Sequence, residues 1–185
     1  MKIVLGGSRH LEYVPGEVAG KLNEWILADE EFLVGDASGS DSAFQSYLHK
    51  RNYPKVLVLS SAGAVRNNLG NWPTQIVDSG LRSKSHAIHA FKDREMTKVA
   101  DSGLMIWDCK SAGTLSNVID LVDAGKECLV WVAPDSELCL FDNPISLEKY
   151  LNSHEEVAIE ARKRLQAFYK RAAKRREDLA NETLF

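Results

Sequence analysis

The chain has 185 residues, of which 44% are hydrophobic and 26% are charged, and its formal net charge is −3. This length suits one domain with a substantial core, and the composition is ordinary for a globular protein. The near balance of charge points to no particular class of partner. The first apolar run, residues 1–5, is too short for a signal peptide, and no run approaches membrane-spanning length, so we expect a cytoplasmic protein without a membrane partner.

Short runs of apolar and β-branched residues mark the predicted strands. The runs are continuous rather than alternating, which is typical of strands buried on both faces of a parallel sheet. Helical patterns separate them, so the sequence predicts an α/β fold, a Rossmann-like open parallel sheet flanked by helices. The predicted strands are Ile3–Leu5, Phe32–Val34, Val56–Leu59, Leu104–Trp107 and Cys128–Val132.

The intervening helices are predicted from periodicity and from end signals. The first follows Pro15, and its apolar residues recur at one-face spacing. The second is expected to begin with Ser40 or Asp41 as its N-cap. The third is expected to cover about 93–100 with an aspartate N-cap, and the fourth to end near Gly125. The residues expected to face the core from the first three helices are Val18, Leu22, Trp25, Ile26, Phe44, Tyr47, Leu48, Met96, Val99 and Ala100.

Residues 60–90 show little periodicity. A long irregular segment within a compact domain is usually functional or disordered, and Trp72 favours some order. We therefore expect this segment to cover one side of a pocket, and whether Arg66–Trp72 closes over a bound molecule is left open. Trp72 is also a candidate for stacking on a nucleobase, whereas Trp107 lies within a strand run and is assigned to the core.

From about Ile145 onward the pattern is helical again. An apolar stripe runs through a dense set of lysines and arginines and must pack on the sheet domain or on a second copy. We expect a Rossmann-like domain over residues 1–143 and a C-terminal amphipathic helical extension over 144–185 that makes a homo-oligomer. Interspersed acidic residues favour a solvated basic face over nucleic-acid binding. The stripe consists of Ala161, Leu165, Phe168, Tyr169 and Ala172.

Turns rich in small residues follow three of the predicted strands. They are Gly6–Arg9, Gly35–Asp41 and the run from Asp108 to Thr114. The carboxyl ends of parallel strands share one edge of a sheet, where ligands of open α/β folds bind. The last turn also opens a helix, whose free amides beside serine and threonine hydroxyls suit an anion. The sequence therefore predicts a phosphate cradle at this edge.

Each turn residue also has a plain structural interpretation, as a helix cap or a turn-forming residue. In the functional interpretation the phosphate binds at Ser111–Thr114, and the planar, charged guanidinium of Arg9 binds a phosphate or carboxylate. Asp36 or Asp41 would bind a ribose hydroxyl, and Asp108 would recognise a sugar or act as a general base. The candidate ligand contacts in the turns are Gly7, Ser8, Arg9, Gly35, Asp36, Ser38, Gly39, Ser111, Gly113 and Thr114.

The cysteines and histidines indicate neither a metal ion nor a cofactor. Cys109, Cys128 and Cys139 lack metal-ligand spacing, and reduced thiols are the simplest interpretation. No histidine near Cys109 could activate it as a nucleophile. The five histidines form no ligand constellation.

The three turns, together with Met96, Ala100-Asp101 and the run Trp107–Thr114, resemble the SLOG superfamily. The resemblance covers residues 1 to about 132 and is greatest to a small bacterial and phage-type branch with a G-S-R opening and an S-x-G-T turn. It implies a Rossmann-like domain that binds nucleotides or nucleotide-derived ligands. The superfamily includes the "lonely guy" phosphoribohydrolases, which release cytokinin bases from their ribose monophosphates.

The resemblance to those hydrolases is incomplete. Their motif is P-G-G-x-G-T-x-x-E, of which Gly113 and Thr114 match, while 109–111 replace the Pro-Gly-Gly start. Asn117 stands at the glutamate position and cannot act as a carboxylate base. The family's catalytic arginine precedes the position of Met96, where this chain has Lys92, Asp93 and Arg94. The resemblance therefore supports phosphate binding, with Asn117 as a further ligand contact, more than it supports hydrolysis.

Three functions remain open from the sequence. The first is binding of a nucleotide or nucleotide-derived small molecule through the phosphate cradle. The second is hydrolysis or transfer at a nucleotide N-glycosidic bond, with Asp108 or Asp41 replacing the absent glutamate as the catalytic carboxylate. The third is a non-catalytic protein that oligomerises through its C-terminal helix.

Overall fold

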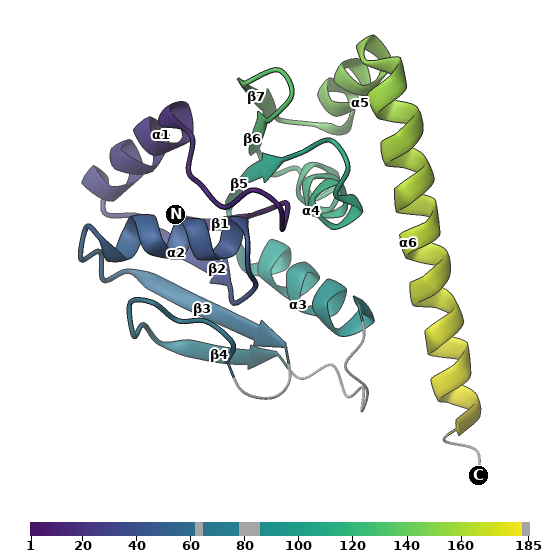
Figure 1. The fold of residues 1–185 in the computed structure, drawn as a ribbon, viewed down its shortest axis with the longest axis horizontal. Coiled ribbons are helices and arrows are strands. Elements are labelled where there is room, and N and C mark those ends of the chain that lie inside the picture. Colours follow the sequence, from purple (N-terminus) through teal and green to yellow (C-terminus); the bar gives the residue numbers. More distant parts are fainter. Residues whose placement is uncertain (62–64, 78–85, 183–185) are drawn as a thin grey trace.

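The computed structural model describes residues 1–61, 65–77 and 86–182, without the side chains of 86–91, 168 and 171–182. Seven strands form one sheet in the order β4-β3-β2-β1-β5-β6-β7 (Figure 1). Strands β1 to β6 run parallel to their neighbours, and β7 is antiparallel to β6. The strands are β1 (Lys2–Gly7), β2 (Glu31–Gly35), β3 (Val56–Ser61), β4 (Thr74–Val77), β5 (Ser102–Trp107), β6 (Cys128–Val132) and β7 (Glu137–Phe141).

Helices cover both faces of the sheet (Figure 1). In the strands, side chains of successive residues point to opposite faces: Ile3 and Leu5 join the hydrophobic cluster beneath α1 and α2, and Val4 joins the cluster beneath α3 and α4. The predicted α/β, Rossmann-like fold is thereby confirmed. The helices are α1 (Gly16–Leu27), α2 (Ser40–His49), α3 (His86–Val99), α4 (Ala112–Asp123), α5 (Pro144–Ser153) and α6 (Glu155–Glu182).

The two strands that the sequence did not predict, β4 and β7, lie at the edges of the sheet. Edge strands are covered on fewer sides, and β4 lacks the continuous apolar run of a buried parallel strand, whereas β7 carries such a run at 138–141 that the sequence prediction overlooked. In β4 only Val77 is buried, and in β7 only Phe141 is. The expectation of an irregular 60–90 segment is therefore wrong for β4 and for the start of α3, while residues 62–64 and 78–85 lie outside the described residues.

Two predicted helix starts are wrong. Helix α3 spans His86–Val99, so Asp93 lies within the helix and is not its N-cap. The N-cap of α2 is Gly39, whose φ of 78° places it in the left-handed region, rather than Ser40 or Asp41. Helix α1 starts directly after Pro15 and α4 ends at Asp123, close to Gly125, as predicted. Gly125 has a φ of 71°, which suits a residue just past a helix.

The C-terminal helices pack on the α4 side of the sheet. Leu147 and Leu151 of α5, and Ala158 and Ala161 of α6, belong to the same hydrophobic cluster as α4. Helix α6 then continues along the outer side of α4 and α3 to the C-terminal end (Figure 1). The division of the chain at residue 143 stays a prediction. Among the described residues, no helix is both long and apolar enough to span the hydrocarbon layer of a membrane.

The strand order places a topological switch point between β1 and β5 at the carboxyl edge. From β1 the chain adds β2, β3 and β4 on one side and then crosses to place β5 on the other side of β1. The connections after β1 and β5 therefore diverge to opposite faces. Such a topological switch point is the usual ligand position in open α/β sheets.

Candidate functional site

Hydrogen bonds join the ends of β1 and β5 at the switch point. Ser8, which is fully buried, donates from its Oγ to Asp108 Oδ1 over 2.8 Å and accepts from the Asp108 amide over 3.0 Å. The Ser8 amide donates to the Ile106 carbonyl over 2.8 Å, and Gly7 lies directly against Ile106. The side chain of Ser8 is thus held within the protein, and its role there is to fix the two turns together.

The turn after β2 reaches across to the turn after β1. Ser40 Oγ donates to the Ser8 carbonyl over 2.8 Å. A Cβ at Gly39 would overlap the backbone of Arg9, so only glycine allows this approach. The turns after β1, β2 and β5 are therefore in contact, as the sequence led us to expect, although the ligand roles of their residues stay predictions.

The turn between β5 and α4 is organised around Asp108. Its Oδ1 accepts from the amides of Lys110, over 2.9 Å, and Ser111, over 2.7 Å. Partial burial favours the neutral acid, but these bonds and the one from Ser8 outweigh it and lower the pKa of Asp108. Asp108 is therefore an ionised group that stabilises its own turn, and it occupies two amides that a phosphate could otherwise use.

The first turn of α4 leaves a smaller anion site than the sequence suggested. Ser111 Oγ accepts from the Thr114 amide over 3.3 Å and from Thr114 Oγ1 over 2.9 Å, so both hydroxyls serve the helix cap. The first amides of a helix have no acceptor within the helix, which leaves those of Ala112 and Gly113 for a ligand. A Cβ at Gly113 would meet nothing within 4 Å, and Asn117 lies one turn further along and is half-buried.

Two exposed cations belong to the turns that meet here. Arg9 lies in the turn after β1 and Lys110 in the turn after β5. Within the described ranges, neither side chain forms an ion pair with a carboxylate. Ser38, also exposed, lies in the turn after β2 that contacts Arg9. An anion bound here would meet positive side chains as well as the amides of α4.

A second cluster of charges lies at the ends of β2 and β3. Asp36 is fully buried, and its Oδ2 accepts from Ser60 Oγ over 2.7 Å. Arg66 donates to the same carboxylate from Nε, over 3.1 Å, and from Nη2, over 2.6 Å. The Arg66 backbone amide donates to Asp36 Oδ2 over 3.2 Å. Burial alone would raise the pKa of Asp36, but the Arg66 and Ser60 bonds hold it well below its usual range. Both carboxylate oxygens are engaged, which disfavours the ribose-binding role considered for Asp36.

Lys92 of α3 completes this cluster. Its side chain is only 4% exposed, and its Nζ lies 3.8 Å from Asp36, 4.0 Å from Asp41 and 3.6 Å from Asp93. Burial opposes the charged ammonium, but the three carboxylates outweigh it and raise the pKa of Lys92. A Cβ at Gly35 would overlap Asp41 Oδ2 and lie 2.5 Å from Lys92 Nζ, so a larger residue here would force these two buried side chains to shift.

Within this cluster, Asp41 is the carboxylate whose pKa is raised. Burial raises it to about 6 from an ordinary 3.8, although the nearby Lys92 ammonium opposes the shift. Its Oδ2 accepts from the Ala37 amide over 3.2 Å. Asp41 therefore changes protonation close to neutral pH, which is a property of acid–base groups in enzymes.

Arg66 and Lys92 are the residues that sequence reasoning missed. Arg66 was placed in a covering segment and Lys92 only near an uncertain family position. A buried lysine has no local sequence signal, because its partners Asp36 and Asp41 lie more than fifty residues away. Contact between the ends of β2 and β3 and the start of α3 is visible only in the fold.

Two candidates have structural roles. Trp72 is 8% exposed and donates from Nε1 to the Tyr53 carbonyl over 2.8 Å, so its ring belongs to the core and does not offer a face to a base. The neighbouring Asn67 and Leu69 are bonded to α2, which ties 65–73 to that helix. Cys109 is buried, and burial together with nearby Asp135 raises the pKa of its thiol to about 12, so it remains protonated at neutral pH.

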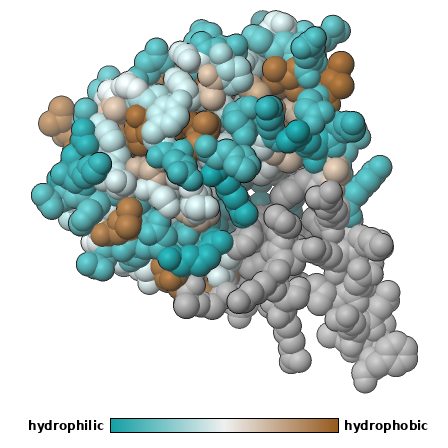
Figure 2. Space-filling model, viewed as in Figure 1, coloured by the Kyte–Doolittle hydropathy of each residue, from teal (hydrophilic) through white to brown (hydrophobic). Residues whose placement is uncertain are grey.

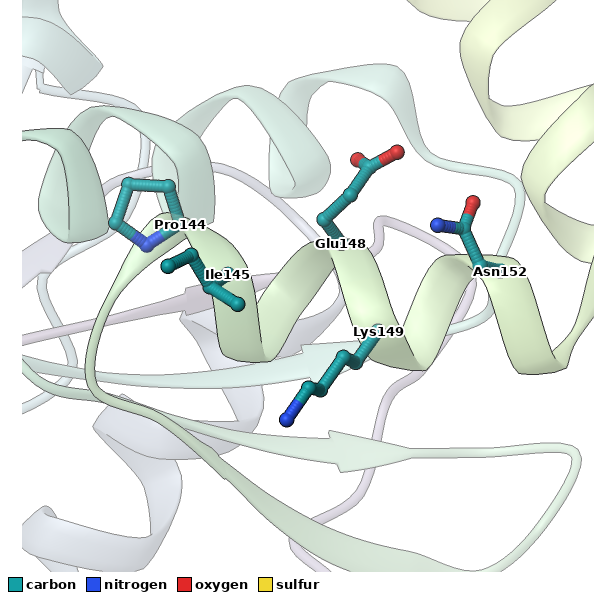
Figure 3. A pocket seen from close by; sticks show the side chains of 5 residues that line it. All are labelled: Pro144, Ile145, Glu148, Lys149 and Asn152. Carbon is teal, nitrogen blue, oxygen red and sulfur yellow. The ribbon is translucent and has the colours of Figure 1, made fainter.

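A separate hollow lies on α5, away from these turns. It is open, has a volume of about 490 Å³, and all five residues that line it come from one helix (Figure 3). Glu148 and Asn152 point to one side of it and Lys149 to the other (Figure 3). Exposed hydrophobic residues are scattered over the visible face rather than gathered in one large patch (Figure 2). Within the described part of the chain, no three metal-ligating residues are grouped around a metal position.

Comparison with known proteins adds no identification. No protein-family model matches the chain, and no curated protein or solved structure matches it significantly. The functional conclusion therefore rests on the geometry of the carboxyl edge.

Proposed function

We propose that this protein binds a nucleotide or nucleotide-derived small molecule at the carboxyl edge of its sheet, and that it is related to the SLOG superfamily. One observation supports this most strongly: the turns after β1, β2 and β5 are bonded together at the topological switch point. The family resemblance, carried by the same three turns, agrees with this choice. A cytoplasmic location belongs to the same proposal.

The phosphate would contact Arg9, Lys110 and the amides of Ala112 and Gly113. This differs from the expectation from sequence alone, because the hydroxyls of Ser111 and Thr114 are engaged in capping α4. Paired guanidinium and amide donors are the usual partners of phosphate in proteins. The sugar would then lie toward Ser38, at the exposed side of the turn after β2.

Isothermal titration with nucleoside monophosphates, ADP-ribose and cyclic dinucleotides tests the proposal. Arg9→Gln and Lys110→Gln should each weaken binding of the best ligand about tenfold or more, since a hydrogen bond to a charged group contributes about 1.5–3 kcal/mol. Arg51→Gln is the matched control, because Arg51 is exposed at the far end of α2 and stacks on Tyr47. The proposal is refuted if no ligand binds, or if all three variants bind like the wild type.

The second candidate is cleavage of a nucleotide N-glycosidic bond, and the raised pKa of Asp41 favours it. A carboxyl group that titrates near pH 6 can donate a proton to a departing base and then accept one from water. Asp108 suits this role less well, because its carboxylate is ionised and bonded to its own turn.

Release of free base from a nucleoside monophosphate, followed by chromatography, tests this candidate. Asp41→Asn should abolish release, and the wild-type rate should depend on a group that titrates near pH 6. Asp41→Asn that retains the wild-type rate would exclude Asp41 as the acid, and absence of base release from every monophosphate tested would exclude the activity.

Self-association through α6 is a further part of the proposal. Helix α6 has 28 residues, and its first half supplies the buried Ala158 and Ala161, whereas Phe168 and Ala172 of the predicted stripe have side chains outside the described set. Truncation after Lys170 keeps the first half of α6, which packs on the sheet domain. If α6 joins two copies, this truncation lowers the mass measured by light scattering to that of the monomer; an unchanged mass contradicts this role.

A further inference from the structure

The Arg66 guanidinium is both held by hydrogen bonds and partly exposed to solvent. Its Nε and Nη2 are bonded to Asp36, a carboxylate that is fully buried and is also held by Ser60. The side chain of Arg66 is nevertheless 43% exposed. One edge of the guanidinium is thus fixed against the protein, while Nη1 and the second N–H of Nη2 have no partner among the residues that the structure describes.

We propose that Arg66 is a second anion-binding group of the carboxyl edge, and that the ligand carries two anionic groups, one at Arg9 and Lys110 and the other at Arg66. This inference rests on the proposed nucleotide site and specifies its ligand class. The second group is a phosphate or carboxylate, because the free edge of a guanidinium matches the oxygen spacing of these two anions.

The turn after β2 connects the backbone positions that contact the two arginines. Gly39, at one end of this turn, touches the backbone of Arg9, and Asp36, at the other end, holds Arg66. Three residue steps separate the Cα atoms of positions 36 and 39, which span at most about 11 Å. A ligand that lies along this turn past the exposed Ser38 would reach both arginines with anionic groups at the two ends of one nucleotide-sized unit.

The charges around Arg66 also explain why its guanidinium is held in place. Asp36 pairs with it directly, and Lys92, Asp41 and Asp93 belong to the same cluster. The Asp36 hydrogen bond and the charges of the three carboxylates raise the pKa of Arg66 and keep it charged. A prepositioned cation loses little side-chain freedom on binding an anion, which favours affinity.

Titration calorimetry with AMP, ADP and adenosine 3′,5′-bisphosphate tests the inference on the full chain. The wild type should bind at least one of the two-phosphate probes about tenfold more tightly than AMP, as expected for an added charge-assisted contact. Arg66→Gln should remove this preference and leave the affinity for AMP unchanged. Arg51→Gln, remote from the edge, should keep the preference.

A second variant separates anion binding from folding, because Arg66→Gln alone leaves the buried Asp36 carboxylate unpaired. The double variant Asp36→Asn with Arg66→Gln removes both charges and allows the two amides to bond. It should fold, bind AMP as the wild type does, and lack the preference for two phosphates. If AMP binds and the preference survives in this double variant, or never appears in the wild type, the inference about Arg66 is overturned and the proposed function stands. If none of the three probes binds, the adenine nucleotide site itself is refuted, and Arg66 with it.

Discussion

Replacement of Asp41 by asparagine should change how stability depends on pH. Burial beside α3 raises the pKa of Asp41 from 3.8 to about 6 in the folded protein, and its side chain is only 14% exposed. Between these two values the folded state binds a proton that the unfolded state has lost. The contribution of Asp41 to stability is therefore most favourable below pH 4, and it is progressively lost as the pH rises through 6.

The size of the effect follows from the shift. One pKa unit corresponds to about 1.4 kcal/mol, so the full loss is about 3 kcal/mol, of which about 2 kcal/mol falls between pH 4 and pH 7. The asparagine side chain cannot ionise, and the Asp41→Asn variant should therefore gain about 2 kcal/mol relative to the wild type over that range, even though Lys92 loses one of its partners.

Urea unfolding of both proteins at half-unit pH steps from 4 to 7 measures this difference. The difference in unfolding free energy between Asp41→Asn and the wild type should rise with pH and level off above pH 6.5. Asp29→Asn is the control, because Asp29 forms an exposed pair with Lys55 and should show no such rise. A difference that is flat with pH, or that falls, would refute the assignment of a buried, partly neutral Asp41.

Three further predictions concern the turns. Gly35→Ala should destabilise the protein by about 1–3 kcal/mol in urea unfolding, because its Cβ overlaps Asp41 and Lys92; an unchanged midpoint contradicts the packing at this end of β2. Ser8→Ala should cost about 1–3 kcal/mol by leaving the Asp108 amide without its partner, and a neutral result would mean that the two turns are not joined through Ser8. The Cys109 thiol should resist iodoacetamide at pH 8 in the folded protein and react on unfolding, since burial raises its pKa to about 12; rapid labelling of native Cys109 would show that the β5–α4 turn is open.

The central sheet could be predicted from sequence because burial on both faces leaves a continuous apolar run. The runs at 3–5, 32–34 and 104–107 all became central strands. The edge strand β4 carries no such run, since solvent covers part of it, and it was missed; β7 carries an apolar run at 138–141 that was overlooked. Asp93 illustrates another error: it precedes an apolar pattern as an N-cap would, but α3 begins at His86, seven residues earlier.

The candidate site was predictable only in part. Glycine and serine after a strand are local signals, and they led to the correct convergence of Ser8, Gly39 and Ser111 at one edge. Those local signals cannot reveal which polar groups form hydrogen bonds or ion pairs with one another. Asp36 is bonded to Arg66, thirty residues away, and Asp108 to Ser8, one hundred residues away, so two carboxylates that seemed free for a ligand are engaged within the protein.

An amide-resolved NMR titration of the ¹⁵N-labelled protein with AMP tests the position of the binding site most directly. We expect the largest shift changes at Arg9, at Ser38 and Gly39, and from Lys110 to Gly113, with saturation at a single dissociation constant. Changes confined to the α5 hollow around Ile145 and Lys149, or no saturable change at the ends of β1, β2 and β5, would contradict a nucleotide site at the switch point.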